Sequence, residues 1–299
     1  MNEGMRKLMI FWVCLLMMSC FGKRERRGNS DIFAEATPLG QLTNEKLEEV
    51  SGLAASWVNP GYLWTHNDSG NPAEVYLVDE KLNIRMSCRL KGVKNRDWED
   101  IAVGPGPEEN KRYVYVADIG DNNARHALKF IYRFEEPVLD DARRDITIDA
   151  FEKISFRLED GKKDTEAVMI HPETRNIYIV SKREKPVVVY EIKYPYSSGE
   201  TLTAKKVATL PLTQIVSAGI SSDGNEVIMK NYDHIYYWRI EGKTIAEALQ
   251  GKPHLLRYTE EPQGEAIAFR RDGLGFYTLS ETIIGEKVFL LYYERKKHD

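Results

Sequence analysis

The sequence predicts an all-β protein, a β-propeller of five four-stranded blades, with six blades as the alternative. The chain contains five copies of one strand–turn–strand pattern, spaced at close to the roughly 40 to 50 residues typical of a propeller blade. In the clearest copy, Asp97 to Asn123, a short apolar strand is followed by a Gly/Pro/Asn turn and an aromatic, β-branched strand that ends in polar residues. The other copies are Ser51–Asp68, Glu166–Lys182, Ala218–Tyr232 and Glu265–Glu281.

The chain begins with the pattern of a signal peptide in residues 1–19, with an apolar run from Leu8 to Met18 and Ser19 before Cys20. The run is too short to span a bilayer. A small residue directly before a cysteine resembles the lipobox of bacterial lipoproteins, in which the cysteine is lipidated and becomes the mature N-terminus. We therefore expect a protein of the bacterial cell envelope, anchored to a membrane through lipid on Cys20, with a secreted or periplasmic protein as the alternative.

Residues 20–31 are expected to form a polar linker, and residues 32–299 are long enough for a single propeller domain. The net charge of −4, with scattered lysines, gives no electrostatic footprint for nucleic acid. Among the 3 cysteines, Cys14 lies in the signal peptide and Cys20 is expected to carry lipid, which leaves Cys88 alone in a strand pattern. No disulfide framework is therefore predicted.

The innermost strands of the five copies align on their pairs of small and apolar residues. The residue before each pair then occupies one equivalent position, which is held by Ser51, Glu99, Glu166, Ala218 and Glu265. The interval from Glu99 to Glu166 is longer than the others, and we attribute the excess to an insertion at Val138–Ala150. The second strands end in the aligned residues Asn67, Asp118, Ser181, Asn231 and Ser280.

Third strands are expected at Val75–Val78, Phe130–Phe134, Val187–Ile192, Ile235–Ile240 and Val288–Tyr293, and fourth strands at Arg85–Leu90, Ile154–Leu158, Lys205–Leu210 and His254–Tyr258. The fifth blade lacks a fourth strand, and we expect Ile32–Leu42 to supply it and close the ring. Pro38 suits an outer edge strand because it removes only a donor that would face solvent. One helix is expected, at Thr244–Gln250, with Thr244 as its cap and Gly251 as its end.

In a propeller, the start of each innermost strand and the end of each second strand open on the same mouth of the central channel. This topology gathers hard oxygen ligands of the kind that Ca²⁺ prefers. The predicted metal ligands are Glu99, Glu166, Glu265, Asp118, Asp121 and Asn122. The alternative is a structural network in which these acids pair with Lys182, Lys230 and Arg125, or acidic turns that are simply solvated.

Other polar and aromatic residues of the same mouth are candidates for contact with a ligand: Asn67, Asp68, Lys182, Lys230, Arg125 and Glu281. Trp98 stands beside Glu99 in an entering turn and could offer a stacking platform. His66 is a candidate general base, although a lone histidine at a strand end is more often structural.

The blade openings EVSGLA, DWEDIA, DTEAVM and QGEAIA resemble those of bacterial β-propeller phytases and of the related SdiA-regulated secreted propellers. The resemblance covers the chain from about Glu49 to Glu281 at the level of pattern. It implies a calcium-rich channel mouth in which Glu99, Glu166 and Glu265 match the blade-opening acids. This sequence departs from those phytases in two ways. They have six blades, whereas five are predicted here, and their dense Lys/Arg cluster, which binds several phosphates, is reduced in this sequence.

Three functions follow from the sequence. The first is a non-catalytic lipoprotein that binds a small molecule or a protein at its channel mouth. The second is a calcium-dependent phosphoester hydrolase, in which the metal bridges phosphate oxygens and activates water. The third is a carbohydrate-active enzyme, which needs two opposed carboxylates such as Glu99 and Glu265. We favour binding, with the phosphoesterase second.

The N-terminal pattern generates a direct test of location. Mass spectrometry of the mature protein from a bacterial host is expected to show an N-terminus at Cys20 that carries acyl chains. More than one chain is expected, because a single chain gives only marginal membrane affinity and would not hold the protein firmly. The Cys20→Ser variant should leave the membrane fraction. An unmodified N-terminus at another residue contradicts the lipid anchor.

Overall fold

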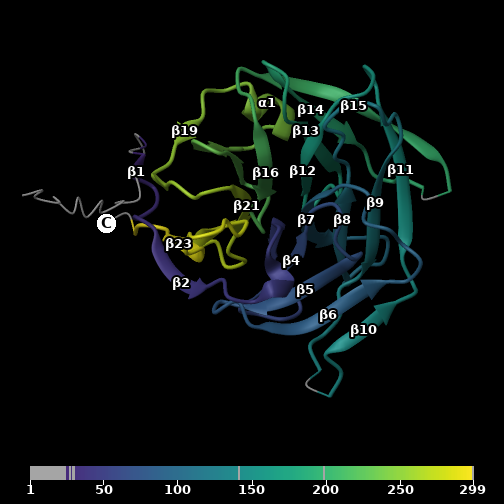
Figure 1. Ribbon diagram of the computed structural model, residues 1–299. Helices are drawn as coiled ribbons and strands as arrows, with labels where there is room; N and C mark the ends of the chain where they lie inside the picture. Colours follow the sequence, from purple (N-terminus) through teal and green to yellow (C-terminus); the bar gives the residue numbers. More distant parts are fainter. Residues whose placement is uncertain (1–24, 27, 29–30, 141, 198, 298–299) are drawn as a thin grey trace, which may run out of the picture.

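The computed structural model describes residues 25–26, 28, 31–140, 142–197 and 199–297. The predicted signal peptide, Cys20 and most of the predicted linker lie outside these residues. The described strands are arranged around a central axis, with the chain passing once around the ring (Figure 1). Within the described residues, no helix is both long and apolar enough to cross a membrane.

Five strands from the five sequence repeats lie innermost and surround the axis. They are β3 (Val50–Ala55), β7 (Trp98–Pro105), β12 (Thr165–Ile170), β16 (Ile215–Ile220) and β21 (Gly264–Phe269). Each pairs with the next strand of its own blade: β4 (Tyr62–Asn67), β8 (Arg112–Asp118), β13 (Ile177–Ser181), β17 (Glu226–Asn231) and β22 (Gly275–Ser280). All five pairings are antiparallel, as expected for hairpins with short turns.

The third strands are β5 (Glu74–Asp79), β9 (Lys129–Glu135), β14 (Val187–Ile192), β18 (Ile235–Arg239) and β23 (Phe289–Glu294). The fourth strands of the first four blades are β6 (Ile84–Leu90), β11 (Glu152–Leu158), β15 (Thr201–Leu210) and β19 (His254–Leu255). The predicted positions agree with these strands apart from His254–Tyr258. There the chain leaves the blade after β19, and β20 (Tyr258–Thr259) pairs instead with β1 (Glu25–Arg26).

The ring closes as the sequence indicated. Strand β2 (Thr37–Gln41) lies in the predicted segment and pairs antiparallel with β23, and Phe33 forms a bridge with Arg295. The pairing register shifts between Pro38 and Gln41, which is where an edge strand tolerates a proline. The first and last parts of the described chain therefore share one sheet.

Two features were not anticipated. The insertion contains β10 (Asp145–Ile148), which runs parallel to β6 and adds a fifth strand to the first blade (Figure 1). Strands β11 and β15 also pair in parallel, so the second and third blades form one eight-stranded sheet.

The predicted helix is present as α1 (Ile245–Leu249), with a capping box between Thr244 and Glu247. A 3₁₀ turn, Glu45–Leu47, precedes β3.

The hydrophobic core consists of five clusters, each between two adjacent blades. The first lies between blades one and two and includes Trp64, Trp98 and Val114. The last lies between blades five and one, where Leu53 packs near Leu279 and Leu290. Because every blade buries both faces against neighbours, the strands are rich in β-branched and aromatic residues on both sides. Cys88 belongs to the first cluster and is buried.

Every innermost strand contains a shift of register at its second residue. The residues at the shift are Ser51, Glu99, Glu166, Val216 and Glu265. The residue before each shift pairs with Asn67, Asp118, Ser181, Asn231 or Ser280, in agreement with the predicted alignment of the second strands. Ala218 was aligned incorrectly in the fourth blade, because Gly219-Ile220 resembles Gly52-Leu53 and the bulge itself has no sequence signal. A bulge re-aims its side chain, and here it turns three glutamates toward the mouth.

The innermost strands are also joined by one buried polar network around Asp100 of β7. Its Oδ1 accepts from the Ile101 N–H at 3.0 Å and from Ser217 Oγ at 3.2 Å, and its Oδ2 accepts from the Val168 N–H at 3.0 Å. Ser217 Oγ in turn accepts from the Ile267 N–H at 3.3 Å. Asp100 thereby connects β7 to β12 and β16, and Ser217 extends the network to β21.

We predict that Asp100→Asn destabilises the protein by roughly 2 to 5 kcal/mol, the cost of leaving one or two buried donors unmatched. Either orientation of the amide places its NH₂ group against a backbone N–H of Ile101 or Val168. Denaturant unfolding followed by circular dichroism measures the effect. Asp145→Asn, at an exposed position of β10, is the control and should change stability by less than about 0.5 kcal/mol.

Candidate metal centre

The acidic mouth is built from two positions in each blade. The bulge on the innermost strand supplies Glu99, Glu166 and Glu265, and the residue after the second strand supplies Asp68, Ile119, Lys182, Tyr232 and Glu281. The residues that enter the innermost strands add Asp97 and Asp164. The mouth thus collects seven carboxylates from four blades.

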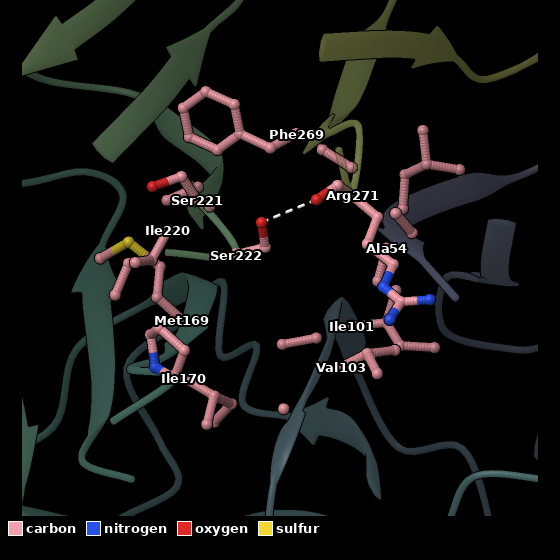
Figure 2. Close-up of a pocket in the computed structure, with 18 of the residues that line it drawn as sticks. Ala54, Ile101, Val103, Met169, Ile170, Ile220, Ser221, Ser222, Phe269 and Arg271 are labelled. Atoms are coloured by element: carbon pink, nitrogen blue, oxygen red, sulfur yellow. Dashed lines mark hydrogen bonds between the residues drawn. The ribbon is translucent and has the colours of Figure 1, made fainter. Parts of the chain in front are cut away.

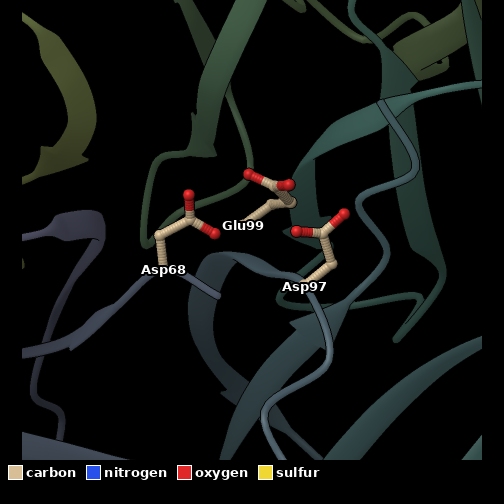
Figure 3. Close-up of side chains that lie close together, drawn as sticks. All are labelled: Asp68, Asp97 and Glu99. Carbon is tan, nitrogen blue, oxygen red and sulfur yellow. The ribbon is translucent and has the colours of Figure 1, made fainter. Parts of the chain in front are cut away.

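Five of these carboxylates form two groups that share Glu99. Asp68, Asp97 and Glu99 each place one oxygen within 4.8 Å of the others, and so do Glu99, Asp164 and Glu166. Figure 3 shows the carboxylates of Asp68 and Asp97 on either side of Glu99. Oxygens bound at about 2.3 to 2.6 Å on opposite sides of one Ca²⁺ lie at most about 5 Å apart. Each group therefore has a spread that one cation can span.

Positive charge compensates only part of this cluster. Lys182 Nζ lies 3.0 Å from Glu166, and Arg183 Nε lies 2.6 Å from Asp164. Within the described residues, no lysine or arginine nitrogen lies within 4 Å of Asp68, Asp97 or Glu99. The group around Asp68 is therefore the less neutralised of the two.

The crowding changes the acidity of the carboxyl groups. Burial, and then the charge of Glu166, raises the pKa of Glu99 well above its ordinary range. Burial raises the pKa of Glu166 to about 7 despite the opposing effect of Lys182, and it raises the pKa of Asp68 to about 6. Glu99 is hydrogen-bonded to Glu166, so without a cation Glu99 holds the proton and Glu166 pairs with Lys182.

A second acidic pair lies farther around the mouth. Glu265 accepts from the Tyr232 hydroxyl at 2.5 Å and is hydrogen-bonded to Glu281. Burial and the neighbouring Glu265 raise the pKa of Glu281 to about 8. Glu265 and Glu281 do not belong to either group of three carboxylates.

Gly120 leaves the space that the cluster occupies. A Cβ atom added there would overlap Oε1 of Glu99 and the carboxylate of Asp97. The turn after β8 thus leaves room for the carboxylates of Glu99 and Asp97.

The three predicted ligands in the string DIGDNN have other partners. Asp118 binds the Asp97 N–H at 3.2 Å and Arg96 at 3.3 Å. Asp121 caps the following turn by accepting from the N–H groups of Arg125 and His126, both at 2.7 Å. Burial favours the neutral form of Asp121, but these two bonds outweigh it and lower its pKa. The third residue, Asn122, accepts from Arg183. Their role is to hold the loop and the adjacent acids in place.

Three expected ligand-contact or catalytic residues are buried. His66 has no exposed surface, and burial lowers its pKa to about 4, so it is not placed to act as a base at the mouth. Trp98 is also fully buried, edge-on to His66 with ring centroids 5.8 Å apart, and cannot offer a stacking platform. Asn67 donates to the Lys46 carbonyl at 2.8 Å and so fastens the 3₁₀ turn.

Lys230 and Arg125 do not serve the acidic cluster. Lys230 is fully buried and donates to the Gly264 carbonyl at 2.5 Å and the Tyr258 hydroxyl at 2.8 Å, with Glu261 at 3.5 Å. Arg125 is exposed, and its backbone rather than its guanidinium meets Asp121. Of the three cations expected in a structural network with the acids, Lys182 pairs with Glu166, and Arg183, which was not expected, pairs with Asp164.

Sequence reasoning missed Asp97 and Asp164 as cluster members and Asp100 as the buried centre. Asp97 and Asp164 each stand two residues before a bulge glutamate, a repeated D-x-E spacing that could have identified them.

Asp100 follows Glu99 directly, and the alternation of side chains in a strand would place these two on opposite sides of the strand. Only the bulge and the ring geometry show that both are buried.

The strand pairing defines an all-β propeller with an acidic channel mouth. No family model and no curated protein matches the chain. Similar solved structures include the WD40 repeats of RRP9, with 11% identity, a TM-score of 0.41, and 83% of this chain and 67% of that chain covered. The Dos1 propeller shows 11% identity and a TM-score of 0.40, with 88% of this chain and 96% of that chain covered. The resemblance to phytase-like propellers stays a prediction.

The raised pKa values predict how stability depends on pH. The unfolded carboxyl groups titrate near about pH 4, whereas Asp68, Glu166 and Glu281 titrate at about 6, 7 and 8 in the folded protein. Between these limits the folded state binds more protons, so the free energy of unfolding falls as pH rises. These three pKa values correspond to about 6 kcal/mol between about pH 5.5 and 8.5. Because solvent screens the partly exposed Asp68 and Glu281, we expect a loss on the order of 3 kcal/mol in the absence of divalent cations.

Denaturant unfolding in chelator across this pH range measures the slope. Glu99→Gln should reduce the slope but keep the part that comes from Glu281, whose pKa is raised by burial and Glu265. At high pH the variant should be at least as stable as the parent protein, because an amide can donate to Glu166 without ionising. Glu109→Gln changes an exposed carboxylate in the β7–β8 turn and should keep the parental slope. Stability that rises with pH would contradict the assignment of crowded, desolvated acids.

Proposed function

We propose that this chain is a non-catalytic propeller of the bacterial cell envelope that binds Ca²⁺ at its acidic mouth and, through the metal, an anionic ligand or partner. Cys20 anchors it to the membrane in this proposal. The observation that carries the proposal is the sharing of Glu99 by two groups of three carboxylates with little compensating charge.

The donor set fits calcium in kind and in spacing. All five groups offer carboxylate oxygens and no nitrogen or sulfur, which favours a hard cation over zinc or copper. Asp68, Asp97 and Glu99 are the residues expected to hold the ion, because no lysine or arginine in the described part of the chain forms an ion pair with them. Asp68 and Asp97 are partly exposed, so a bound ion would have coordination positions open to solvent or to a ligand.

A bound calcium ion would supply positive charge that replaces the shared protons of the mouth. Each residue around the ion would then have a separate role. Glu99 holds or releases a proton toward Glu166, Lys182 balances Glu166, and Asp118 with Arg96 fixes the entry to β7. Cation binding therefore requires deprotonation, and affinity should increase with pH.

We predict that Ca²⁺ at a hundredfold excess over its Kd stabilises the protein by about 2.7 kcal/mol and raises Tm by roughly 5 to 10 °C. Differential scanning fluorimetry in Ca²⁺ and in chelator measures the shift. Asp68→Asn and Glu99→Gln should remove it, whereas Glu109→Gln should retain it. The shift should also grow between about pH 5.5 and 8.5, because protons compete for the same oxygens.

Phosphoester hydrolysis is the second candidate, and one observation favours it: a cation, Lys182, lies beside the carboxylate cluster and could meet a phosphate oxygen. A panel of phosphoesters incubated with the Ca²⁺-loaded protein separates the two functions. Turnover that is lost in Glu99→Gln and in chelator assigns the hydrolase. A thermal shift without turnover supports binding, and no shift at millimolar Ca²⁺ contradicts both.

A further inference from the structure

The end of the channel opposite the acidic mouth is apolar. There the innermost strands of all five blades converge on a cavity of about 70 Å³. Its wall consists mainly of aliphatic and aromatic side chains, and Figure 2 shows several of them around the opening: Ile101, Val103, Met169, Ile170, Ile220 and Phe269. The two mouths of one channel therefore have opposite chemistry.

The rim of this apolar end is held by contacts between turns of different blades. Ser222 Oγ in the β16–β17 turn donates to the Arg271 carbonyl in the β21–β22 turn at 2.7 Å (Figure 2). The Arg271 guanidinium donates to the Trp57 carbonyl in the β3–β4 turn. Glu136, which is buried, accepts from the N–H groups of Trp57 and Val58. These contacts fix the rim across four blades before any ligand arrives.

Two guanidinium groups flank the half-exposed indole of Trp57 on this rim. The guanidinium carbons lie 4.5 Å from the ring centroid for Arg112 and 5.1 Å for Arg271. Within the described residues, neither side chain forms an ion pair with a carboxylate. Each therefore has donors available for an anion.

Two acids of the same turns pair with other cations, and a third is held by neutral donors, whereas Glu109 of the β7–β8 turn is exposed. Glu108 lies 3.0 Å from Lys111, and Asp272 lies 3.0 Å from Arg270. Asp223 accepts from Ser221 at 2.5 Å and from the Asn225 N–H at 3.1 Å. The guanidinium groups of Arg112 and Arg271 thus keep donors that no carboxylate of the described residues occupies.

We propose that the apolar end binds a segment of a partner protein that inserts one aliphatic side chain between flanking carboxylates. A space of about 70 Å³ holds roughly five water-sized atoms, which suits the four carbons of a leucine side chain and excludes a long acyl chain or a fused ring. The carboxylates on either side would meet Arg112 and Arg271, and the segment would pack on Trp57. In chelator, the carboxylates of the opposite mouth would repel an acidic segment, so that binding under this condition reports the apolar end.

Three capped peptides test whether binding requires both the aliphatic side chain and the flanking carboxylates. They are acetyl-Glu-Leu-Glu-amide, acetyl-Glu-Gly-Glu-amide and acetyl-Lys-Leu-Lys-amide. Each peptide is titrated into the full folded chain, and tryptophan fluorescence is recorded. Trp57 is half-exposed whereas Trp64, Trp98 and Trp238 are buried, so a ligand at the rim should change mainly the emission of Trp57. The first peptide should change the emission saturably, with a Kd at least about tenfold lower than those of the other two. Trp57→Phe should abolish the signal.

Variants locate the site. Arg271→Gln and Arg112→Gln should each weaken the first peptide by about tenfold, whereas Arg143→Gln, which alters an exposed guanidinium before β10, should have no effect. Calcium binding at the other mouth should be unchanged in all three, which separates this proposal from the proposed function. Equal binding of either control peptide, or of 4-methylpentanoate, overturns the proposal. Self-association of the parent protein that Arg271→Gln abolishes assigns the surface to a second copy instead and also overturns it.

Discussion

The structure depends on a carboxylate placed where the five innermost strands meet. Asp100 contacts backbone or side-chain donors of β7, β12 and β16, and Ser217 passes the connection to β21. Ser51 Oγ donates to the Glu99 carbonyl at 2.9 Å, which joins β3 to β7 at the same level. Five blades held only by apolar clusters could slide along one another, whereas hydrogen bonds between their innermost strands fix one relative height. Burial raises the pKa of Asp100 well above its ordinary range, and the hydrogen bonds from Ile101, Val168 and Ser217, with one from the Ala218 N–H, oppose that effect.

The fixed height of the strands determines the chemistry of the acidic mouth. A bulge at the same level in every blade presents three glutamates toward the axis, and the neighbouring entry turns add Asp97 and Asp164. Carboxylates this close destabilise the ionised state of one another, and protons or cations relieve that cost. The same geometry therefore links stability, pH and cation binding, because all three act on the oxygens around Glu99.

The sequence specified the fold through local patterns, and these were read correctly. Strand positions, the polar residues that end the second strands and the closing strand β2 all follow from alternation and turn composition. The errors concern features without a local signal. The bulge at Val216 cannot be recognised from its residues, and the burial of Trp98, His66 and Lys230 depends on which neighbouring blade covers them. Asp100 looks in sequence like one more acid of a solvated turn, because its partners lie in distant parts of the chain.

The closing strand has a consequence for synthesis of the protein. Strand β2 leaves the ribosome early, but its partner β23 ends only a few residues before the C-terminus. Until β23 emerges, the fifth blade is incomplete, the cluster between blades five and one has no second wall, and the sheet edges of the nascent chain stay open. The fifth blade therefore cannot close until β23 has been synthesised, and its closing contact spans almost the whole described chain. Loss of the last strand would leave an open ring with an exposed apolar face, a form that is recognised by chaperones and proteases and prone to aggregation.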